Sequence, residues 1–303
     1  MRTTLIVNPN AGRGRGAIVQ PYVTKKLTEF EIPFNIVKTE VPEQAIDFAY
    51  QAAINGSKRV VAIGGDGTCN EVINGLLAAA SEGHDTTFGL IPVGSGNDLA
   101  YSLGIPTDIE QACLVLKHGS EMAIDIGKVT VDGKSQFFVN AVGLGFDGEM
   151  CVILRQTRRL HGLLMYIWSA LMVWFFGKWP THMTVMLDDS TIQQPNVLVN
   201  IGNGSRVAGG FLLAPDAKLD DGMFDITVVG KASRLGLLLL LPRMLKGTFQ
   251  HHPVISMHRT SHVQVVAKDG MAAHIDGEVL CQHGREFEFE ILPKALNVLQ
   301  NKK

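Results

Sequence analysis

The sequence has few cysteines and no pattern that would join them. Its 303 residues contain four cysteines, far apart and without a C-x-x-C pair: Cys69, Cys113, Cys151 and Cys281. This spacing argues against a disulfide framework or a zinc site, and it favours reduced thiols in a cytoplasmic protein. With 46% hydrophobic and 18% charged residues, the composition also excludes a disordered chain.

Long hydrophobic runs and an excess of charge of one sign are also absent. The first apolar run, Leu5-Ile6-Val7, is too short for a secretory signal. The most apolar stretch, residues 163–176, falls short of the ~20 residues that a membrane-spanning helix needs, so we expect no transmembrane span. The 27 basic and 29 acidic residues give a formal net charge of −2, which predicts no nucleic-acid partner and leaves local basic faces for an anionic lipid.

The first 125 residues alternate short β-branched runs with helical patterns. Strands are predicted over residues 4–7, 35–37, 60–63 and 88–91, with helices between them. This alternation is typical of an α/β fold with a parallel sheet. Thr107 and Glu110 form a capping box for one helix, which Gly119 follows.

After Asp125 the pattern changes to that of a mainly β domain. A hairpin is predicted over 128–131 and 136–139 around Asp132-Gly133, with later strands over 185–187, 263–267 and 286–291. Two apolar helical insertions interrupt the strands, at 151–176 and 235–246. We predict an α/β domain over 1–125, a mainly β domain over 126–292, and a tail, 293–303, that returns to the first domain with a short helix over 295–299.

Three glycine-rich turns each follow a predicted strand of the first domain. They are Asn8-Pro9-Asn10-Ala11-Gly12, Gly64-Gly65-Asp66-Gly67-Thr68 and Pro92-Val93-Gly94-Ser95-Gly96-Asn97-Asp98. The ends of parallel strands meet at one edge, where open α/β sheets bind ligands. Glycine lets a phosphate approach the backbone, helices expected at Asn70 and Asn97 direct amides toward it, and Thr68 and Ser95 add hydroxyls. Three tight βα turns without a ligand are the alternative.

Known nucleotide motifs do not explain these turns. The second turn has no lysine, so there is no Walker A motif, and the dinucleotide fingerprint and the protein kinase signatures are missing as well.

Taken in order along nearly the whole chain, the motifs resemble those of the diacylglycerol kinase catalytic domain family of lipid kinases, which includes bacterial diacylglycerol kinases, YegS-like lipid kinases and the related sphingosine kinases. Besides the three turns, the resemblance rests on Asp125-Ile126-Gly127, Gly209-Gly210 with Pro215, Asp221-Gly222 and Asp276-Gly277-Glu278. It implies an α/β nucleotide domain like that of NAD kinases, a β-sandwich-like second domain, and an active site in the cleft between them. ATP and Mg²⁺ are the implied cofactors.

The resemblance also implies roles for individual residues. Glu278 is the expected base, and the acidic residues Asp66, Asp98 and Asp125 are expected to hold Mg²⁺, because carboxylates beside a polyphosphate need an intervening cation. The expected nucleotide contacts are Asn8, Pro9, Asn10, Ala11, Gly12, Thr39, Gly64, Gly65, Asp66, Gly67, Thr68, Asn70, Glu71, Gly94, Ser95 and Asn97. Helix capping by Asp98 and a plain turn at Asp66 are the alternatives. A second Asp-Gly-Glu, at 147–149, ranks lower because the family match there is to a structural glycine-rich segment.

The stretch from Lys218 to Met223 resembles the family's second, structural Mg²⁺ site. Lys218 and Met223 would contribute backbone carbonyls and Asp221 its carboxylate, while a β-turn with Asp-Gly at its tip is the alternative reading.

The expected acceptor is a lipid because basic and aromatic residues occur together. Arg155, Arg158 and Arg159 precede an aromatic-rich stretch ending at Trp179, which suits a membrane interface, although a buried helix pair would also fit. We predict an ATP- and Mg²⁺-dependent kinase of diacylglycerol or a related lipid, cytoplasmic and peripheral on the inner face of the membrane. A homodimer stays open, as do a kinase of a soluble acceptor such as NAD and a non-catalytic lipid-binding regulator.

Overall fold

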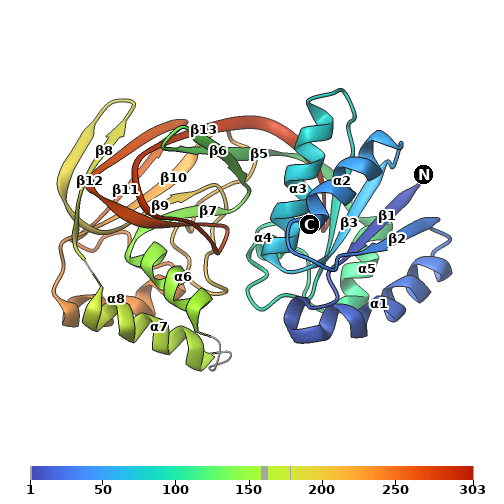
Figure 1. Cartoon of the computed structure of the whole chain (residues 1–303), viewed down its shortest axis with the longest axis horizontal. Coiled ribbons are helices and arrows are strands. Elements are labelled where there is room, and N and C mark those ends of the chain that lie inside the picture. The colour runs from blue at the N-terminus through green and yellow to red at the C-terminus, as the bar shows by residue number, and fades with distance from the viewer. Residues whose placement is uncertain (1, 158–162, 178, 303) are drawn as a thin grey trace. The chain divides into compact units, whose positions relative to one another are not determined.

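The chain divides into two compact units. In the computed structural model, which describes residues 2–157, 163–177 and 179–302, one unit is Met1–Ile126 with Pro293–Lys303 and the other is Gly127–Leu292 (Figure 1).

The first unit is a parallel sheet with helices on both faces. Its strands run in the order β4-β3-β1-β2 and all pair in parallel. The strands are β1 (Thr3–Val7), β2 (Phe34–Lys38), β3 (Arg59–Gly64) and β4 (Thr87–Pro92), and the helices are α1 (Ala11–Glu29), α2 (Gln44–Ile54), α3 (Asp66–Ala80), α4 (Asp98–Ser102) and α5 (Ile109–His118). Helices α2 and α3 pack together, as do α1 and α5 (Figure 1). Strands β1 and β4 are buried throughout, as their apolar sequences require in a sheet covered on both sides.

The second unit is an antiparallel assembly of strands with three helices. Its strands are β5 (Ser120–Val131, which begins in the first unit), β6 (Lys134–Phe138), β7 (Ala141–Gly145), β8 (Thr181–Leu187), β9 (Thr191–Gly202), β10 (Phe224–Gly230), β11 (Ile255–Thr260), β12 (His262–Ile275) and β13 (Glu278–Gln300). The long strands β9 and β12 each pair with β7 at one end and with β8 at the other. The helices are α6 (Phe146–Gln156), α7 (Leu163–Phe176) and α8 (Arg234–Lys246). The predicted α/β plus mainly β architecture is confirmed.

Three local expectations were wrong. The tail over 295–299 is the end of β13 and not a helix, because Leu296 and Val298 are buried with Asn297 exposed between them, and Val298 pairs with Phe88 of β4. That pairing satisfies the edge of β4, which would otherwise expose its backbone groups. Helix α5 is capped by Asp108, whose side chain accepts the Gln111 N–H, and not by Thr107. Helix α3 begins at Asp66 rather than at Asn70, so the second turn forms its first turn.

Candidate functional site

The three glycine-rich turns touch one another within the first unit. They follow β1, β3 and β4, which are neighbours in the sheet. A Cβ built on Gly12 would lie 1.9 Å from the Val93 carbonyl oxygen, and one on Gly94 would lie 2.6 Å from the Gly65 Cα. Gly12 also has a φ of +57°, in the left-handed region that favours glycine. The turns therefore converge on one point at the carboxyl edge of the sheet, as predicted, and only glycine fits these contacts.

Asn8 connects the first turn to the second. Its Nδ2 donates to Thr68 Oγ1 (3.0 Å), and its Oδ1 accepts the Asn10 N–H (3.0 Å). Thr68 is buried in the first turn of α3, and Gly65 occupies the N-cap of that helix with no side-chain cap bond. The amino end of α3, with its partial positive charge, is thereby fixed at the turns, where it favours an anion.

Asp66 connects the second turn to the third. Its Oδ1 accepts the Leu99 N–H (3.1 Å) in the first turn of α4. Asn97 begins that helix in the left-handed conformation (φ +53°), and its Nδ2 donates to the Gly94 carbonyl (2.9 Å). The capping role that sequence reasoning allowed for Asp98 is thus performed by Asp66 from another turn. Asp98 itself is buried in the first turn of α4.

Some of the remaining predicted nucleotide contacts lie at or next to the three turns, whereas others make hydrogen bonds within or between helices. Thr39 is buried at the carboxyl end of β2 and donates its N–H to the Val7 carbonyl (2.9 Å), next to Asn8. Glu71, by contrast, accepts the N–H groups of Glu43 and Ala45 (3.1 and 3.3 Å), and so stabilises the start of α2. Pro9, Ala11 and Ser95 lie on the turns, and Asn70 Oδ1 accepts a hydrogen bond from Asn74 Nδ2 (3.0 Å) within α3.

The three predicted Mg²⁺ holders have different surroundings. Asp66 and Asp98 stand in the first turns of α3 and α4, beside the converging turns. Asp125 is fully buried, and its Oδ1 accepts the Lys294 N–H (2.8 Å) of the returning tail. In the described part of the chain, no three His, Cys, Asp or Glu side chains cluster as a metal site. The hard carboxylate oxygens of Asp66 and Asp98 suit Mg²⁺, which commonly takes one or two carboxylates together with phosphate oxygens.

Glu278 follows a tightly held hairpin turn in the second unit. Asp276 (φ +47°) and Gly277 (φ +86°) form the turn between β12 and β13. The Asp276 carboxylate accepts three backbone N–H groups, from Val139, Asn140 and Ala141, each at 2.9 Å. The Asp276 carboxylate is therefore hydrogen-bonded to backbone N–H groups, and the other acid of this segment, Glu278, is exposed. Sequence reasoning gave Asp276 no role, although an Asp-Gly pair between two strands is a turn signal.

The second Asp-Gly-Glu segment lies in the first turn of α6, with Asp147 and Gly148 buried and Glu149 half-buried. Asp147 is buried in the first turn of α6, where its Oδ2 lies 2.9 Å from His274 Nε2. Nearby, the Cys151 thiol donates to the Gly277 carbonyl at 3.7 Å. Burial raises the pKa of this thiol, and the negative charges of Asp147 and Glu278 raise it further. Asp147 is therefore buried in hydrogen-bonded surroundings, and its negative charge acts on the Cys151 thiol that contacts the turn before Glu278.

The stretch from Lys218 to Met223 is a turn followed by a bend at Asp221 and Gly222. Gly222 has a φ of +72°, and Asp221 Oδ1 accepts the Met223 N–H (3.2 Å). Asp221 Oδ2 is paired with Arg259, whose Nε lies 3.5 Å from Asp225 Oδ1. Burial raises the pKa of Asp225, and Arg259 opposes that rise. A Mg²⁺ ion there would have to share the Asp221 carboxylate with a guanidinium group.

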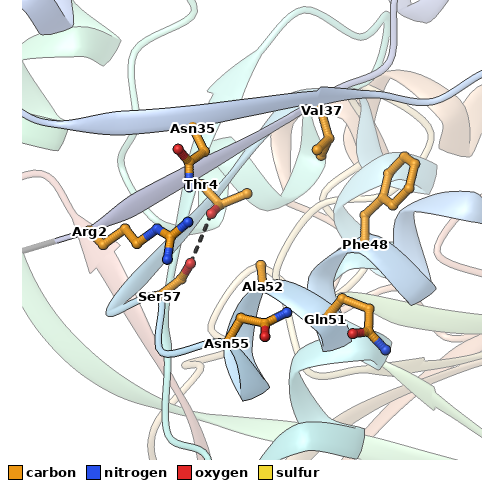
Figure 2. A pocket seen from close by; sticks show the side chains of 9 residues that line it. All are labelled: Arg2, Thr4, Asn35, Val37, Phe48, Gln51, Ala52, Asn55 and Ser57. Atoms are coloured by element: carbon orange, nitrogen blue, oxygen red, sulfur yellow. Dashed lines mark hydrogen bonds between the residues drawn. The ribbon is translucent and has the colours of Figure 1, made fainter.

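A small cavity lies elsewhere in the first unit. It has a volume of about 190 Å³ and is lined by Arg2 and by residues of β1, β2 and α2 and of the segment after α2, including Asn35 and Phe48 (Figure 2). Thr4 Oγ1 and Ser57 Oγ form a hydrogen bond of 2.8 Å across its wall. None of the three glycine-rich turns contributes to it.

Only part of the predicted membrane-facing stretch lies within the described residues. Among the described residues, no helix has both the length and the apolar character to cross a bilayer. Arg155 is exposed near the end of α6, and Trp168, Phe175 and Phe176 are exposed on α7. Arg158 and Arg159 lie outside the described residues.

Comparisons with known proteins agree with this arrangement. The family model of the diacylglycerol kinase catalytic domain matches residues 2–129, and that of the YegS C-terminal NAD kinase beta sandwich-like domain matches residues 140–300. A diacylglycerol kinase of Bacillus subtilis is 31% identical over 282 residues, covering 91% of this chain and 89% of the relative. A protein of Chromohalobacter salexigens, named as a probable YegS-like lipid kinase, is 29% identical over 256 residues. The match covers 83% of this chain and 78% of the relative.

A solved structure matches the fold. The crystal structure of a Bacillus anthracis protein assigned to the diacylglycerol kinases superimposes with a TM-score of 0.80 at 23% identity, covering 99% of this chain and 95% of that one. With the two family models side by side along the sequence and a 31%-identical relative over nearly its whole length, this chain belongs to the lipid kinase family built on the diacylglycerol kinase catalytic domain.

Proposed function

We propose that this protein transfers the γ-phosphoryl group of ATP, with Mg²⁺, to a hydroxyl group of diacylglycerol or a closely related lipid. The observation that carries the proposal is the convergence of the turns at Gly12, Gly65 and Gly94 at the carboxyl edge of the sheet. The relatives named as diacylglycerol kinases supply the substrate class.

The reaction transfers one phosphoryl group, and three parts of the chain are assigned to it. The lipid hydroxyl oxygen forms a bond to the γ-phosphorus while the bond from that phosphorus to the β,γ-bridging oxygen breaks, so ADP leaves with the electron pair. Backbone amides of the turns and the amino ends of α3 and α4 orient the phosphates. Asp66 and Asp98 would hold Mg²⁺, which, when bound, neutralises charge on the phosphates. Glu278 accepts the proton of the attacking hydroxyl.

The assignment of Glu278 rests on its surroundings within the second unit. Its side chain is exposed directly after a turn that three hydrogen bonds to Asp276 hold in place. A base must be accessible to its substrate and held in position, and an exposed side chain beside a turn fixed by hydrogen bonds supports that role for Glu278. In the second Asp-Gly-Glu segment, Asp147 is buried against His274, and Glu149, the glutamate in the position of Glu278, is half-buried.

The direct test is phosphorylation of a panel of acceptors. The protein is incubated with labelled ATP and Mg²⁺ in mixed micelles that contain diacylglycerol, monoacylglycerol, phosphatidylglycerol, a sphingoid base or ceramide, with NAD and sugars as soluble acceptors. We expect label in one lipid class and none in the soluble acceptors. Label in NAD and in no lipid would replace the proposal with a kinase of a soluble acceptor.

The base is tested by Glu278→Gln. We expect kcat to fall by at least ~100-fold while ATP affinity is kept, because the substitution removes proton acceptance and leaves the nucleotide turns unchanged. The matched control is Glu149→Gln, the glutamate of the second Asp-Gly-Glu segment. Near-normal turnover of the Glu278 variant together with an inactive Glu149 variant would transfer the role to the other segment.

A further inference from the structure

Helix α8 has apolar residues on both of its faces. Leu237, Leu240 and Met244 are buried and belong to a core cluster of the second unit. On the opposite side Leu235, Leu238, Leu239 and Leu245 are 65%, 52%, 68% and 48% exposed. One apolar face is enough to attach a helix to its core, and a helix that is apolar all round is ordinarily enclosed by protein or lipid. The exposed leucine face is therefore not needed for packing α8 on the core, and it is available to contact a partner.

Helix α7 carries a similar stripe close to one end of α8. Trp168, Leu171, Phe175 and Phe176 are exposed at helical spacing, with Phe176 at 76%. The Trp179 ring joins the two helices, since its centroid lies 5.9 Å from that of Trp174 and 5.5 Å from the Arg234 guanidinium. Both helices belong to the same unit (Figure 1). Single exposed leucines are ordinary on a protein surface, but two helices linked through Trp179 that each expose a stripe of large apolar side chains are the kind of feature that marks an interaction site.

The segments that carry these two helices contain basic residues and no acidic ones, although the Glu149 carboxylate of α6 lies close to Gly177 at the end of α7. Residues 150–187 and 226–268, which contain α7 and α8, include no aspartate or glutamate, although the whole chain has 29 of them. Arg234, Arg243 and Lys246 are exposed on α8. Basic residues around exposed leucines and aromatic rings are the composition of an interfacial helix, with the long basic side chains reaching the headgroups. Two copies of this patch facing each other would bring like charges together, which disfavours a second copy as the occupant.

We propose that the exposed leucine face of α8, with the apolar stripe of α7, docks on the surface of an anionic lipid bilayer. The leucines enter the boundary between headgroups and acyl chains, and Arg234, Arg243 and Lys246 pair with anionic headgroups. This inference deepens the proposed function, because a lipid kinase must reach its acceptor at a bilayer, but its test does not depend on phosphorylation.

The test is sedimentation of the full chain with vesicles. Vesicles of phosphatidylcholine mixed with phosphatidylglycerol are compared with phosphatidylcholine alone, using wild type, Leu238→Ser with Leu239→Ser, and Arg243→Gln with Lys246→Gln. The matched control is Ile18→Ser with Val41→Ser, which removes two apolar side chains of the first unit that are 76% and 60% exposed. Because all these side chains are exposed, the variants should fold, and thermal unfolding checks this.

We expect wild type and the control to bind the anionic vesicles. The leucine variant should bind roughly tenfold more weakly or worse, and the charge variant should lose its preference for phosphatidylglycerol. Binding of the leucine variant equal to that of wild type would overturn the proposal. So would a wild-type dimer that the leucine substitutions turn into a monomer, because the patch would then be an interface between copies.

A water-soluble short-chain diacylglycerol separates this proposal from the proposed function. If wild type binds vesicles but phosphorylates neither form of diacylglycerol, the docking surface stands and the kinase assignment fails. If the leucine variant phosphorylates the short-chain acceptor as wild type does but loses activity on vesicles, both stand. Equal activity of the two proteins on vesicles contradicts the docking surface alone.

Discussion

His274 Nε2 lies 2.9 Å from Asp147 Oδ2, and both side chains are nearly buried. The pair lies above Gly143 of β7, where a Cβ would be 2.3 Å from each of these two atoms. His274 Nδ1 also accepts the Gly277 N–H at 3.4 Å, a weak bond that reaches the turn before Glu278. A buried polar pair thus supports the hairpin that presents the proposed base.

Removing one partner of this pair should cost stability. We expect His274→Leu to lower the free energy of unfolding by about 3 kcal/mol, because it leaves Asp147 buried without that hydrogen bond. Urea unfolding measures the change, and Asp147→Asn, which keeps a polar partner for the imidazole, should cost clearly less. Equal stability of the leucine variant and wild type would show that Asp147 finds other partners. If the pair also positions the turn, the kcat of His274→Leu should fall while the KM for ATP stays the same.

The glycine at position 12 is predicted to be required for nucleotide binding. In Gly12→Ala the new methyl group would meet the Val93 carbonyl at 1.9 Å, so the first and third turns must separate. We expect the Kd for ATP to rise more than tenfold, measured with a fluorescent ATP analogue. Gly56→Ala is the control, since its φ of +81° imposes comparable backbone strain of about 1 kcal/mol with no atom within 4 Å of the added Cβ. Similar ATP affinity in both variants would mean that the turns are not the nucleotide site.

Two substitutions at Asp66 separate its structural contact from its proposed role with Mg²⁺. Asp66→Asn keeps an oxygen that accepts the Leu99 N–H but removes the negative charge, whereas Asp66→Ala removes both. We expect the asparagine variant to be within about 0.5 kcal/mol of wild-type stability yet at least ~100-fold less active. The alanine variant should be inactive and also lose about 1 kcal/mol, as expected for a lost helix cap. An active asparagine variant would leave Asp66 with its capping contact alone.

Local signals in the sequence were enough to predict the parallel strands, the three turns and the hairpin at Asp132-Gly133. That turn has the two positive φ values that its Asp-Gly sequence favours. Thr107 and Asp108 are both good capping residues in adjacent positions, so the sequence could not choose between them. The strand at the end of β13 depends on the edge of β4, more than 200 residues earlier, which overrides the helical pattern of the short segment 295–299.

The contacts that define the site are also long-range. Asp66 accepts the Leu99 N–H, Asp276 accepts N–H groups of residues 139–141, and Asp221 pairs with Arg259. In each case the partners are more than 30 residues apart in the sequence, so no local pattern brings them together. The sequence motifs single out acidic residues, but they do not tell which of the carboxylates accept hydrogen bonds from backbone N–H groups.

A pH dependence of stability is expected from His258 in β11. Its Nε2 is buried and has no hydrogen-bond partner in the described part of the chain, and burial lowers the pKa of the imidazole below its usual value of 6.5. The folded state therefore favours the neutral ring, and below pH 6.5 the unfolded state binds the proton more readily. The contribution of His258 is fully present above pH 6.5 and is lost as the pH falls toward the lower pKa of the folded state. Urea unfolding at a series of pH values between about 5 and 8 should show stability declining on the acid side, and His258→Gln should flatten that decline while His118→Gln, at an exposed position, leaves it unchanged. An unaltered slope in the His258 variant would assign the decline to other groups.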